Sequence, residues 1–416
     1  MQDDDIRAHV QQQYERYPYP PPNDNLEAFK TGAGFASGCP WNNFHWYWPF
    51  KDRTQNLDIL VAGCGSSQAA KIAFFVPDAR VTAIDLSSDS IAHTQHILDK
   101  YHITNVVLHQ MAIEEIGKLR QKYDLIISTG VLHHLPDPNT GLQALQQCLK
   151  PDGSMYLMVY GRYGRDGVYY IQEIMRQMGL TYENVTDQDI NEIRQFVNQL
   201  PGTHPQRSKQ AFFPLQDRNE IVDLFLHPQD RPYSTDEILE WLDGSGLKLQ
   251  SFLLRAQYMP EYSGLRQSSF YQRICKLPDH QQWAITELYR AATNMHFFTA
   301  CHRDRDEASY RIDFESSNWC NLIPTLNPTV QVDNNNLPAG CVSRLYTPTH
   351  RFPEIHRNIT AIEATLFNLV DGKRTIGEAM TTAAQRQLTT QEANQLRKFY
   401  ADMYDLEYLW FRGSTS

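Results

Sequence analysis

The sequence contains no uninterrupted apolar run near the roughly 18 residues that a membrane-spanning helix requires. Its first residues, MQDDDIRAHVQQQYERY, are acidic and polar, whereas a secretory signal has a basic stretch followed by an apolar one. Basic charge is also in deficit, since 38 lysines and arginines accompany 48 aspartates and glutamates, for a net charge of −10. A general nucleic-acid-binding protein normally has the opposite balance. We therefore expect no membrane span, no export and no nucleic-acid partner, and a cytoplasmic location.

Paired cysteines are absent as well. The seven cysteines are odd in number, lie far apart and form no Cys-x-x-Cys pair, so neither a disulfide framework nor a structural zinc site is expected. The 15 histidines include no HExxH spacing, and we expect no metal site. Hydrophobic residues make up 41% of the chain, which is too many for a disordered protein.

Three parts of the chain differ in composition, and 416 residues exceed the usual length of one domain. Residues 1–56 are rich in aromatics and prolines, a density that disfavours continuous helix. We expect this segment to lay its rings on another surface, either as a wrap over the core or as a lid over a pocket. Residues 57–305 read as the main domain. Residues 306–416 predict a small, mainly helical domain that ends in a hydrophobic hairpin or strand.

Short apolar strands alternate with amphipathic helices in the main domain. Strands are expected at 57–63, 79–87, 105–111, 123–132, 154–161, 247–255 and 295–303. Strands rich in Val, Ile and Leu that alternate with helices are typical of a parallel sheet covered on both faces. Ser234 or Thr235 is expected to cap a helix, with Glu237 near its third position. The fold class predicted is α/β with seven strands.

Two glycines follow the first expected strand, at Gly63 and Gly65. Glycine permits a sharp turn and lets a ligand lie against bare backbone, while the next helix offers free N–H groups and its positive dipole end. Ordinary tight turns use the same residues, so the pattern alone is weak. Asp85 adds weight, because it ends the second strand about 20 residues later, where an acidic side chain meets ribose hydroxyls.

The ligand could be a dinucleotide or a mononucleoside. A dinucleotide site has a third glycine that packs the helix against the strand, whereas Ser66, Ser67 and Gln68 occupy that position here. A mononucleoside is therefore favoured, and an NAD-dependent oxidoreductase remains as an alternative.

Four segments in this order and spacing resemble the class I S-adenosylmethionine-dependent methyltransferases: AGCGSSQ, AIDLS, YDLIISTGVLHHLPDP and LKPDGSMYLMVYG. The resemblance is greatest to a bacterial branch with an AGCGTGQ loop and a GVLHHxxDP motif. It implies a Rossmann-like sheet of seven strands whose last strand is antiparallel, with S-adenosylmethionine as cofactor and S-adenosylhomocysteine as product. It also implies a set of cofactor-binding residues: Ala62, Gly63, Cys64, Gly65, Asp85, Leu86, Ala112, Ile113, Thr129, Gly130 and Val131. This sequence departs from the family at Val61 and Ala112, where many members have acidic residues.

Methyl transfer from a sulfonium is an in-line displacement, which needs a base only when the acceptor must lose a proton. His133 and Tyr160, near the expected strand ends, are the candidates for catalysis, although His133 could equally stabilise its loop. Four candidates for acceptor contact are Tyr17, Tyr19, Arg162 and Tyr163. Arg162 and Arg165 could pair with an anionic acceptor or simply be solvated.

The function predicted is transfer of a methyl group to an acceptor that the sequence does not identify, with a small molecule favoured over a peptide or protein. A non-catalytic protein that binds S-adenosylmethionine for regulation is a further alternative. The segment TAIEATLFNLVDGKRTIGEAM is similar to small winged-helix or peptide-binding modules with an LxDGxRTI turn. The C-terminal domain could therefore dock substrate, mediate dimerisation or simply support the fold.

Overall fold

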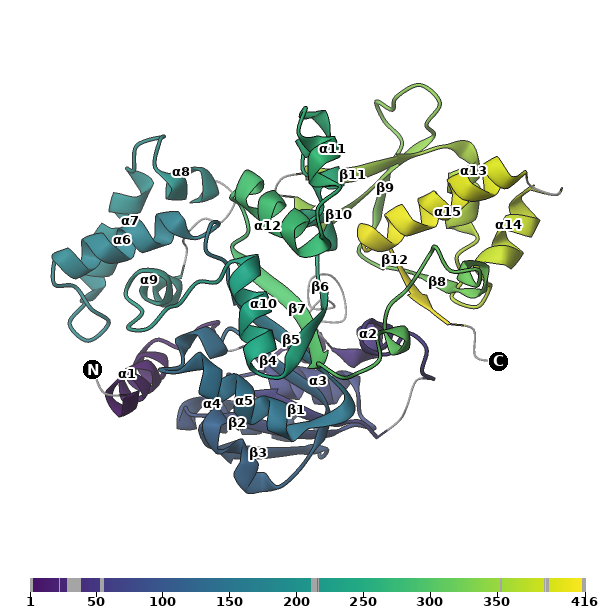
Figure 1. Cartoon of the computed structure of the whole chain (residues 1–416). Helices are drawn as coiled ribbons and strands as arrows, with labels where there is room; N and C mark the ends of the chain where they lie inside the picture. Colours follow the sequence, from purple (N-terminus) through teal and green to yellow (C-terminus); the bar gives the residue numbers. More distant parts are fainter. Residues whose placement is uncertain are drawn as a thin grey trace. The chain divides into compact units, whose positions relative to one another are not determined.

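The computed structural model describes residues 3–21, 23–27, 39–52, 56–210, 215, 217–351, 354–384, 386 and 389–413. The chain divides into two compact units (Figure 1). Unit 1 comprises residues 1–28, 55–249 and 287–303, and unit 2 comprises residues 29–54, 250–286 and 304–416. The aromatic segment expected at 1–56 is thus shared between the units, and its residues 28–38 and 53–55 lie outside the described part.

A seven-stranded sheet forms the centre of unit 1. Its strands are β1 (Asp58–Ala62), β2 (Arg80–Asp85), β3 (Val106–Gln110), β4 (Tyr123–Thr129), β5 (Leu149–Tyr160), β6 (Leu247–Phe252) and β7 (Met295–His302). They lie in the order β3-β2-β1-β4-β5-β7-β6. β1 to β5 pair in parallel, and β7 pairs with β5 in antiparallel fashion. The expected Rossmann-like sheet of seven strands with an antiparallel last strand is confirmed.

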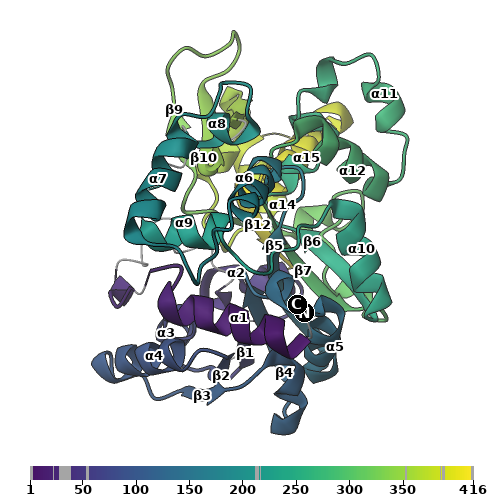
Figure 2. The same ribbon diagram turned by 90° about the vertical axis from the view of Figure 1, so that its left-hand side faces the viewer.

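A group of four helices separates β5 from the next helix of the sheet domain: α6 (Asp166–Gln177), α7 (Asp187–Asn198), α8 (Pro205–Gln210) and α9 (Arg218–Phe225). Figure 2 shows them gathered together above α1. Their buried apolar side chains, such as Ile171 and Phe225, form one hydrophobic cluster. α10 (Thr235–Gly244) follows with the expected cap, because Ser234 and Glu237 form a reciprocal capping box.

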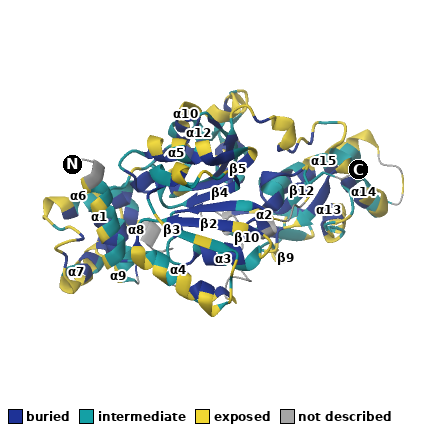
Figure 3. Cartoon of the chain, turned by 90° about the horizontal axis from the view of Figure 1, so that it is seen from below, coloured by how far each residue is buried: buried dark blue, intermediate teal, exposed yellow. Residues whose placement is uncertain are grey.

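The sheet is buried because helices cover both of its faces (Figure 3). α3 (Gln68–Phe75) and α4 (Ser88–Lys100) lie on one face, and α5 (Pro138–Cys148) and α10 lie on the other. Ile59, Leu60 and Ile127 have no exposed surface. Strands buried on both faces explain the continuous apolar runs of the sequence.

Two helices lie in the segment where prolines were expected to prevent them, so that expectation was wrong. α1 (Asp3–Arg16) ends before Pro18, and no proline interrupts it. α2 (Pro40–Tyr47) begins with a proline in its first turn, where the missing N–H leaves no hydrogen bond unmade. Proline bounds these helices instead of breaking them.

Unit 2 has more strand than the sequence suggested. β11 (Glu354–Ile359), β10 (Ser343–Arg351) and β9 (Gln331–Asp333) form a three-stranded sheet, and β12 (Leu409–Arg412) pairs with β8 (Ile323–Leu326). The three expected helices are α13 (Ala361–Asn368), α14 (Ile376–Ala384) and α15 (Thr390–Asp405). Two further helices, α11 (Tyr271–Ile274) and α12 (Asp279–Arg290), precede β7. Helices and strands share one core, which includes Leu345, Phe399 and Leu409.

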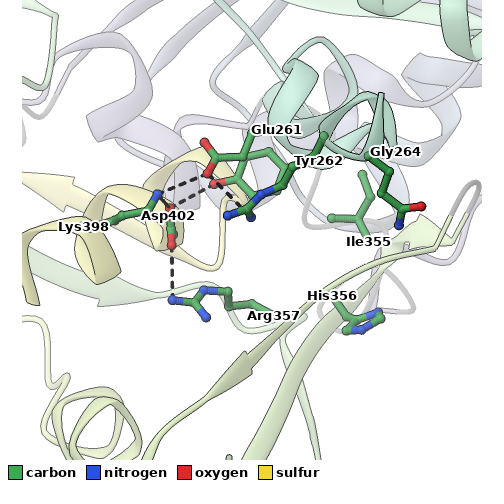
Figure 4. A pocket seen from close by; sticks show the side chains of 10 residues that line it. Glu261, Tyr262, Gly264, Ile355, His356, Arg357, Lys398 and Asp402 are labelled. Carbon is green, nitrogen blue, oxygen red and sulfur yellow. Dashed lines mark hydrogen bonds and ion pairs between the residues drawn. The ribbon is translucent and has the colours of Figure 1, made fainter. Parts of the chain in front are cut away.

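A cavity of about 510 Å³ lies within unit 2, lined by residues of 260–267, β11 and α15 (Figure 4). Asp402 is the most buried charged side chain that lines this cavity among those in its ion pairs, with 9% of the side chain exposed. Its Oδ1 accepts hydrogen bonds from Lys398 Nζ (2.9 Å) and the Tyr262 hydroxyl (3.3 Å). Its Oδ2 lies 3.2 Å from an Arg357 guanidinium nitrogen. The charges of the wall are therefore largely paired with one another.

We expect Asp402→Ala to lower the free energy of unfolding by about 1–3 kcal/mol, because it leaves two cations and a hydroxyl without their shared acceptor. Urea unfolding followed by tryptophan fluorescence measures this loss. Glu307→Ala is the matched control, because its ion pair with Arg311 is exposed and spans 3.7 Å. Equal losses in the two variants would contradict the role given to Asp402.

Candidate active site

The order of the strands locates the site. Chain order reverses between β1 and β4, because β2 lies on one side of β1 whereas β5 lies beyond β4. In open α/β sheets, ligands bind outside the carboxyl ends of the strands at such a switch point. The loops that begin at Gly63 and Gly130 leave β1 and β4 there.

The two glycines after β1 have different tasks. Gly63 has a φ of +74°, and a Cβ placed on it would lie 2.3 Å from a methyl carbon of Val131. Gly63 thus lets the β1 and β4 loops pack together. Gly65 has a φ of +52°, yet a Cβ there would meet nothing within 4 Å. The backbone of Gly65 therefore borders open space, as a ligand lying on bare peptide requires.

Asp85 anchors this loop from the end of β2. Its Oδ2 accepts a hydrogen bond from Gly65 N (2.8 Å), and its Oδ1 accepts one from Ser87 N (2.9 Å). Burial raises the pKa of the carboxyl, and the two backbone donors oppose that rise. A carboxylate oxygen has more than one acceptor position, so both oxygens can still accept from a diol.

Other predicted cofactor residues lie at the same sheet edge or in the loop after β3. Ala62 and Cys64 are buried beside the glycines, and burial raises the pKa of the Cys64 thiol, which keeps it protonated. Leu86 follows Asp85 directly. Ala112 and Ile113, also buried, begin the turn after β3.

Two side chains that the sequence reasoning missed tie the loop together. Gln68 Nε2 donates to Thr129 Oγ1 (3.0 Å), which joins the start of α3 to the end of β4. Thr94 Oγ1 donates to the carbonyl of Gly65 (3.0 Å). Gln68 ends the AGCGSSQ segment, but nothing in the sequence indicated its bond to Thr129, and Thr94 is an ordinary polar residue on α4.

A second group of side chains gathers next to the ends of β4 and β5, and we call it the strand-end cluster. It consists of Tyr14, His133, His134, Tyr160, Arg165, Asp223, His227 and Asp230. The His133 ring lies 4.1 Å from the rings of both His134 and Tyr160, measured between centroids. His134 stacks on His227 at 3.9 Å. The predicted catalytic candidates His133 and Tyr160 are thus brought together.

Buried charge in this cluster is unbalanced. The Arg165 guanidinium lies 3.6 Å above the Tyr160 ring and pairs with Asp230 Oδ2 at 2.9 Å. These two side chains are 7% and 2% exposed. Asp223, also 2% exposed, accepts a hydrogen bond from the Tyr14 hydroxyl (3.3 Å). Burial raises the pKa of Asp223 to about 7; the charge of Arg165 opposes this rise, and that of Asp230 adds to it.

Several buried polar atoms of the cluster make no hydrogen bond within the described residues. They are both ring nitrogens of His133, Nε2 of His134, Nε2 of His227 and Nε of Arg165. Burial lowers the pKa of all three histidines, so the rings are neutral near pH 7. Buried polar groups in proteins normally have partners, and such a concentration without them is typical of a ligand site.

Of the four residues predicted to contact the acceptor, one lies near the strand-end cluster and three lie elsewhere. Burial raises the pKa of Tyr19 to about 12, and Glu220 and Asp223 add to that rise, so Tyr19 faces the acidic side of the cluster. Tyr17 does not join it, because its side chain packs among the apolar residues of α6, α7 and α9. Arg162 instead pairs with Glu237, with Nε 3.1 Å from Oε2. Tyr163 does not join the cluster either: burial raises its pKa, and the charge of Glu287, which is not part of the cluster, adds to that rise.

Arg165 is not solvated, because it pairs with Asp230 beneath the surface. The sequence analysis missed Asp223, His227 and Asp230. Asp223 did leave a signal, since it lies on the buried face of α9 among Ile221, Val222 and Phe225. An acidic residue on an apolar helix face needs a partner or a function.

Among the described residues, no helix combines the length and the apolar character needed to span a bilayer. No three histidine, cysteine, aspartate or glutamate side chains come together there as metal ligands.

Comparison with known proteins agrees with this geometry. The family model described as a methyltransferase domain matches residues 60–155, which contain both glycine loops and Asp85. An uncharacterized protein of Synechococcus sp., syc1184_c, is 27% identical over 298 residues, which are 68% of this chain and 69% of that protein. The malonyl-[acyl-carrier protein] O-methyltransferase of Acetivibrio thermocellus is 33% identical over 127 residues. This match spans 30% of the chain and 44% of the O-methyltransferase, less than half its length.

Similarity to solved structures extends over most of the chain. PKMT2 from Rickettsia typhi in complex with AdoHcy superposes with a TM-score of 0.68 at 15% identity, over 92% of this chain and 76% of that one. At this identity the similarity shows the fold. The matching family model then identifies residues 60–155 as a methyltransferase domain.

Proposed function

We propose that this S-adenosylmethionine-dependent methyltransferase transfers its methyl group to an amino group that is held at the strand-end cluster. The observation that carries the proposal is the buried pair of carboxylates, Asp223 and Asp230, with Arg165 as their only described cationic side chain in the cluster. We also propose that the chain belongs to the bacterial branch of methyltransferases that has the GVLHHxxDP motif.

The residues at the switch point fit the cofactor. The open space beside Gly65 would receive its aminoacyl part, since no side chain fills it. Asp85 would accept hydrogen bonds from both ribose hydroxyls through oxygens that already hold the loop in position. Ala112 and Ile113 would border the adenine, and the missing acidic side chain at position 112 leaves recognition there to the backbone.

The protein's contribution is alignment and charge. When bound, S-adenosylmethionine supplies an electrophilic methyl group on a sulfonium centre. Gly63 and Val131 keep the β1 and β4 loops packed together. His133, which follows in the β4 loop, contacts Tyr160 at the acceptor side. An acceptor amine aligned there attacks without the entropy cost of a bimolecular encounter.

Charge favours nitrogen over oxygen as the accepting atom. An uncompensated carboxylate is costly to bury, and an ammonium ion would balance it. Tyrosine rings would also attract that cation through their faces. A carboxylate or phenolate acceptor would instead add a further negative charge beside Asp223. The match to the O-methyltransferase of Acetivibrio thermocellus covers less than half of that protein, so its acceptor cannot be assumed for this chain.

Methyl transfer from [methyl-³H]S-adenosylmethionine tests the proposal with four acceptors at equal concentration: n-butylamine, a lysine-rich peptide, monomethyl malonate and catechol. We expect label in an amine and little in either oxygen acceptor. Label confined to the oxygen acceptors, or absent from both amines, would overturn the amine assignment. Calorimetric titration with S-adenosylhomocysteine and NAD tests the cofactor separately, with binding expected only for the former.

A further inference from the structure

We propose that Asp223 accepts the proton that the acceptor amine loses before it is methylated, with Tyr14 positioning the carboxylate. The inference rests on the proposed function and assigns a catalytic task to a helix, α9, that lies outside the residues matched as a methyltransferase domain. His133, the sequence-based candidate, is not suited to the task, because burial lowers its pKa and leaves a weak base.

The geometry places Asp223 among the groups that an acceptor would contact. Its Oδ1 accepts from the Tyr14 hydroxyl at 3.3 Å. The Tyr14 ring contacts His227 and His134 edge-on, with centroids 5.7 and 6.3 Å apart. The His134 ring contacts the ring of His133, which lies in the β4 loop. A continuous set of contacts thus joins the carboxylate to the cofactor side of the sheet.

The charged and titratable groups around Asp223 come from several elements. Arg165, before α6, stabilises the ionised form, and Tyr14 of α1 does so through its hydrogen bond. Asp230, after α9, and Glu220, on α9 itself, disfavour ionisation. Burial raises the pKa values of Tyr19 and Tyr160, and the nearby charge of Asp223 adds to that rise. Burial is the largest influence and raises the pKa of Asp223; together with these charges it leaves a pKa of about 7, close to the optimum for a base that works at neutral pH.

The step is balanced without any further reactant. An N–H bond of the bound ammonium breaks, and its proton passes to a carboxylate oxygen of Asp223. The freed nitrogen lone pair forms the new N–C bond while the S–C bond breaks and its electron pair remains on sulfur. The products are a methylated amine, S-adenosylhomocysteine and a protonated Asp223, which then releases its proton to solvent.

The test measures kcat/KM against pH for whichever amine the wild-type enzyme labels, because kcat/KM reports groups of the free enzyme. For the wild type we expect a tenfold fall per pH unit below about pH 7. For Asp223→Asn we expect a loss of at least about 100-fold at pH 8, and no inflection near pH 7. Asp223→Glu should restore part of the rate and the inflection.

Tyr14→Phe gives a readout that a structural role would not produce. Without the Tyr14 hydrogen bond the ionised carboxylate is less stable, so the inflection should move to higher pH. Tyr169→Phe is the matched control, since that hydroxyl donates to Asp230 Oδ1 (3.3 Å), and its inflection should move less.

S-adenosylhomocysteine affinity and melting temperature establish that each variant is folded. If Asp223→Asn transfers methyl groups at the wild-type rate with the same pH profile, the inference is wrong and the proposed function stands. If the wild-type enzyme labels no amine, the proposed function itself fails. If Asp223→Asn does not fold, the direction of the Tyr14→Phe shift decides, and an unshifted inflection contradicts the inference.

Discussion

S-adenosylhomocysteine is expected to bind Asp85→Ala about 100-fold more weakly than the wild-type protein. Under the proposed function the variant loses the carboxylate that accepts from both ribose hydroxyls, and two hydrogen bonds to a charged group together contribute about 3 kcal/mol. It also loses the bonds from Gly65 N and Ser87 N that hold the loop. Isothermal titration calorimetry measures the affinity, and the melting temperature reports whether the fold is retained.

A ligand without ribose hydroxyls separates the two effects. The 2′,3′-dideoxy analogue of S-adenosylhomocysteine should bind weakly to the wild type and about equally to Asp85→Ala. A general collapse of the loop would weaken both ligands by the same factor in the variant. Asp58→Asn is the matched control, because this carboxylate lies at the opposite end of the sheet and pairs with Arg80 and Lys150. The affinity of Asp58→Asn for S-adenosylhomocysteine should stay within twofold of the wild-type value. A loss comparable to that of Asp85→Ala would contradict the assignment of Asp85.

The geometry of the proposed cofactor site was predictable because its determinants are local. Positive φ at Gly63 and Gly65 calls for glycine, and Asp85 ends a strand, so each residue is recognisable from its neighbours in the chain. The seven strands were predictable for a related reason, since burial on both faces demands continuous apolar runs. Their antiparallel last member followed from the resemblance to a family.

The acceptor side was not predictable, because its parts come from distant segments. Tyr14 and Asp223 are 209 residues apart and meet only when α1 lies against the α6–α9 group. Tyr17, three positions after Tyr14, was the more conspicuous residue, yet it packs in an apolar core. In unit 2, the polar sequence of β9 to β11 gave little apolar alternation, and these strands were missed.

Asp223→Asn is expected to be more stable than the wild-type protein at pH 8 and equally stable near pH 4. In the unfolded chain the carboxyl ionises near its ordinary pKa of 3.8, whereas in the folded protein its pKa is about 7. Between these values the folded state binds more protons, so the free energy of unfolding falls as pH rises. Ionising the buried group costs the wild type about 4 kcal/mol by pH 8, and an amide avoids that cost.

Melting temperatures of the two proteins, taken every half pH unit from 4 to 8, measure the difference directly. Groups that titrate equally in both proteins cancel, so the gap should open between pH 4 and 7 and then stay constant. A gap that does not depend on pH would show that Asp223 is not a buried, ionising group. Stability gained with the loss of methyl transfer would mean that the chain keeps a destabilising carboxylate because the reaction uses it.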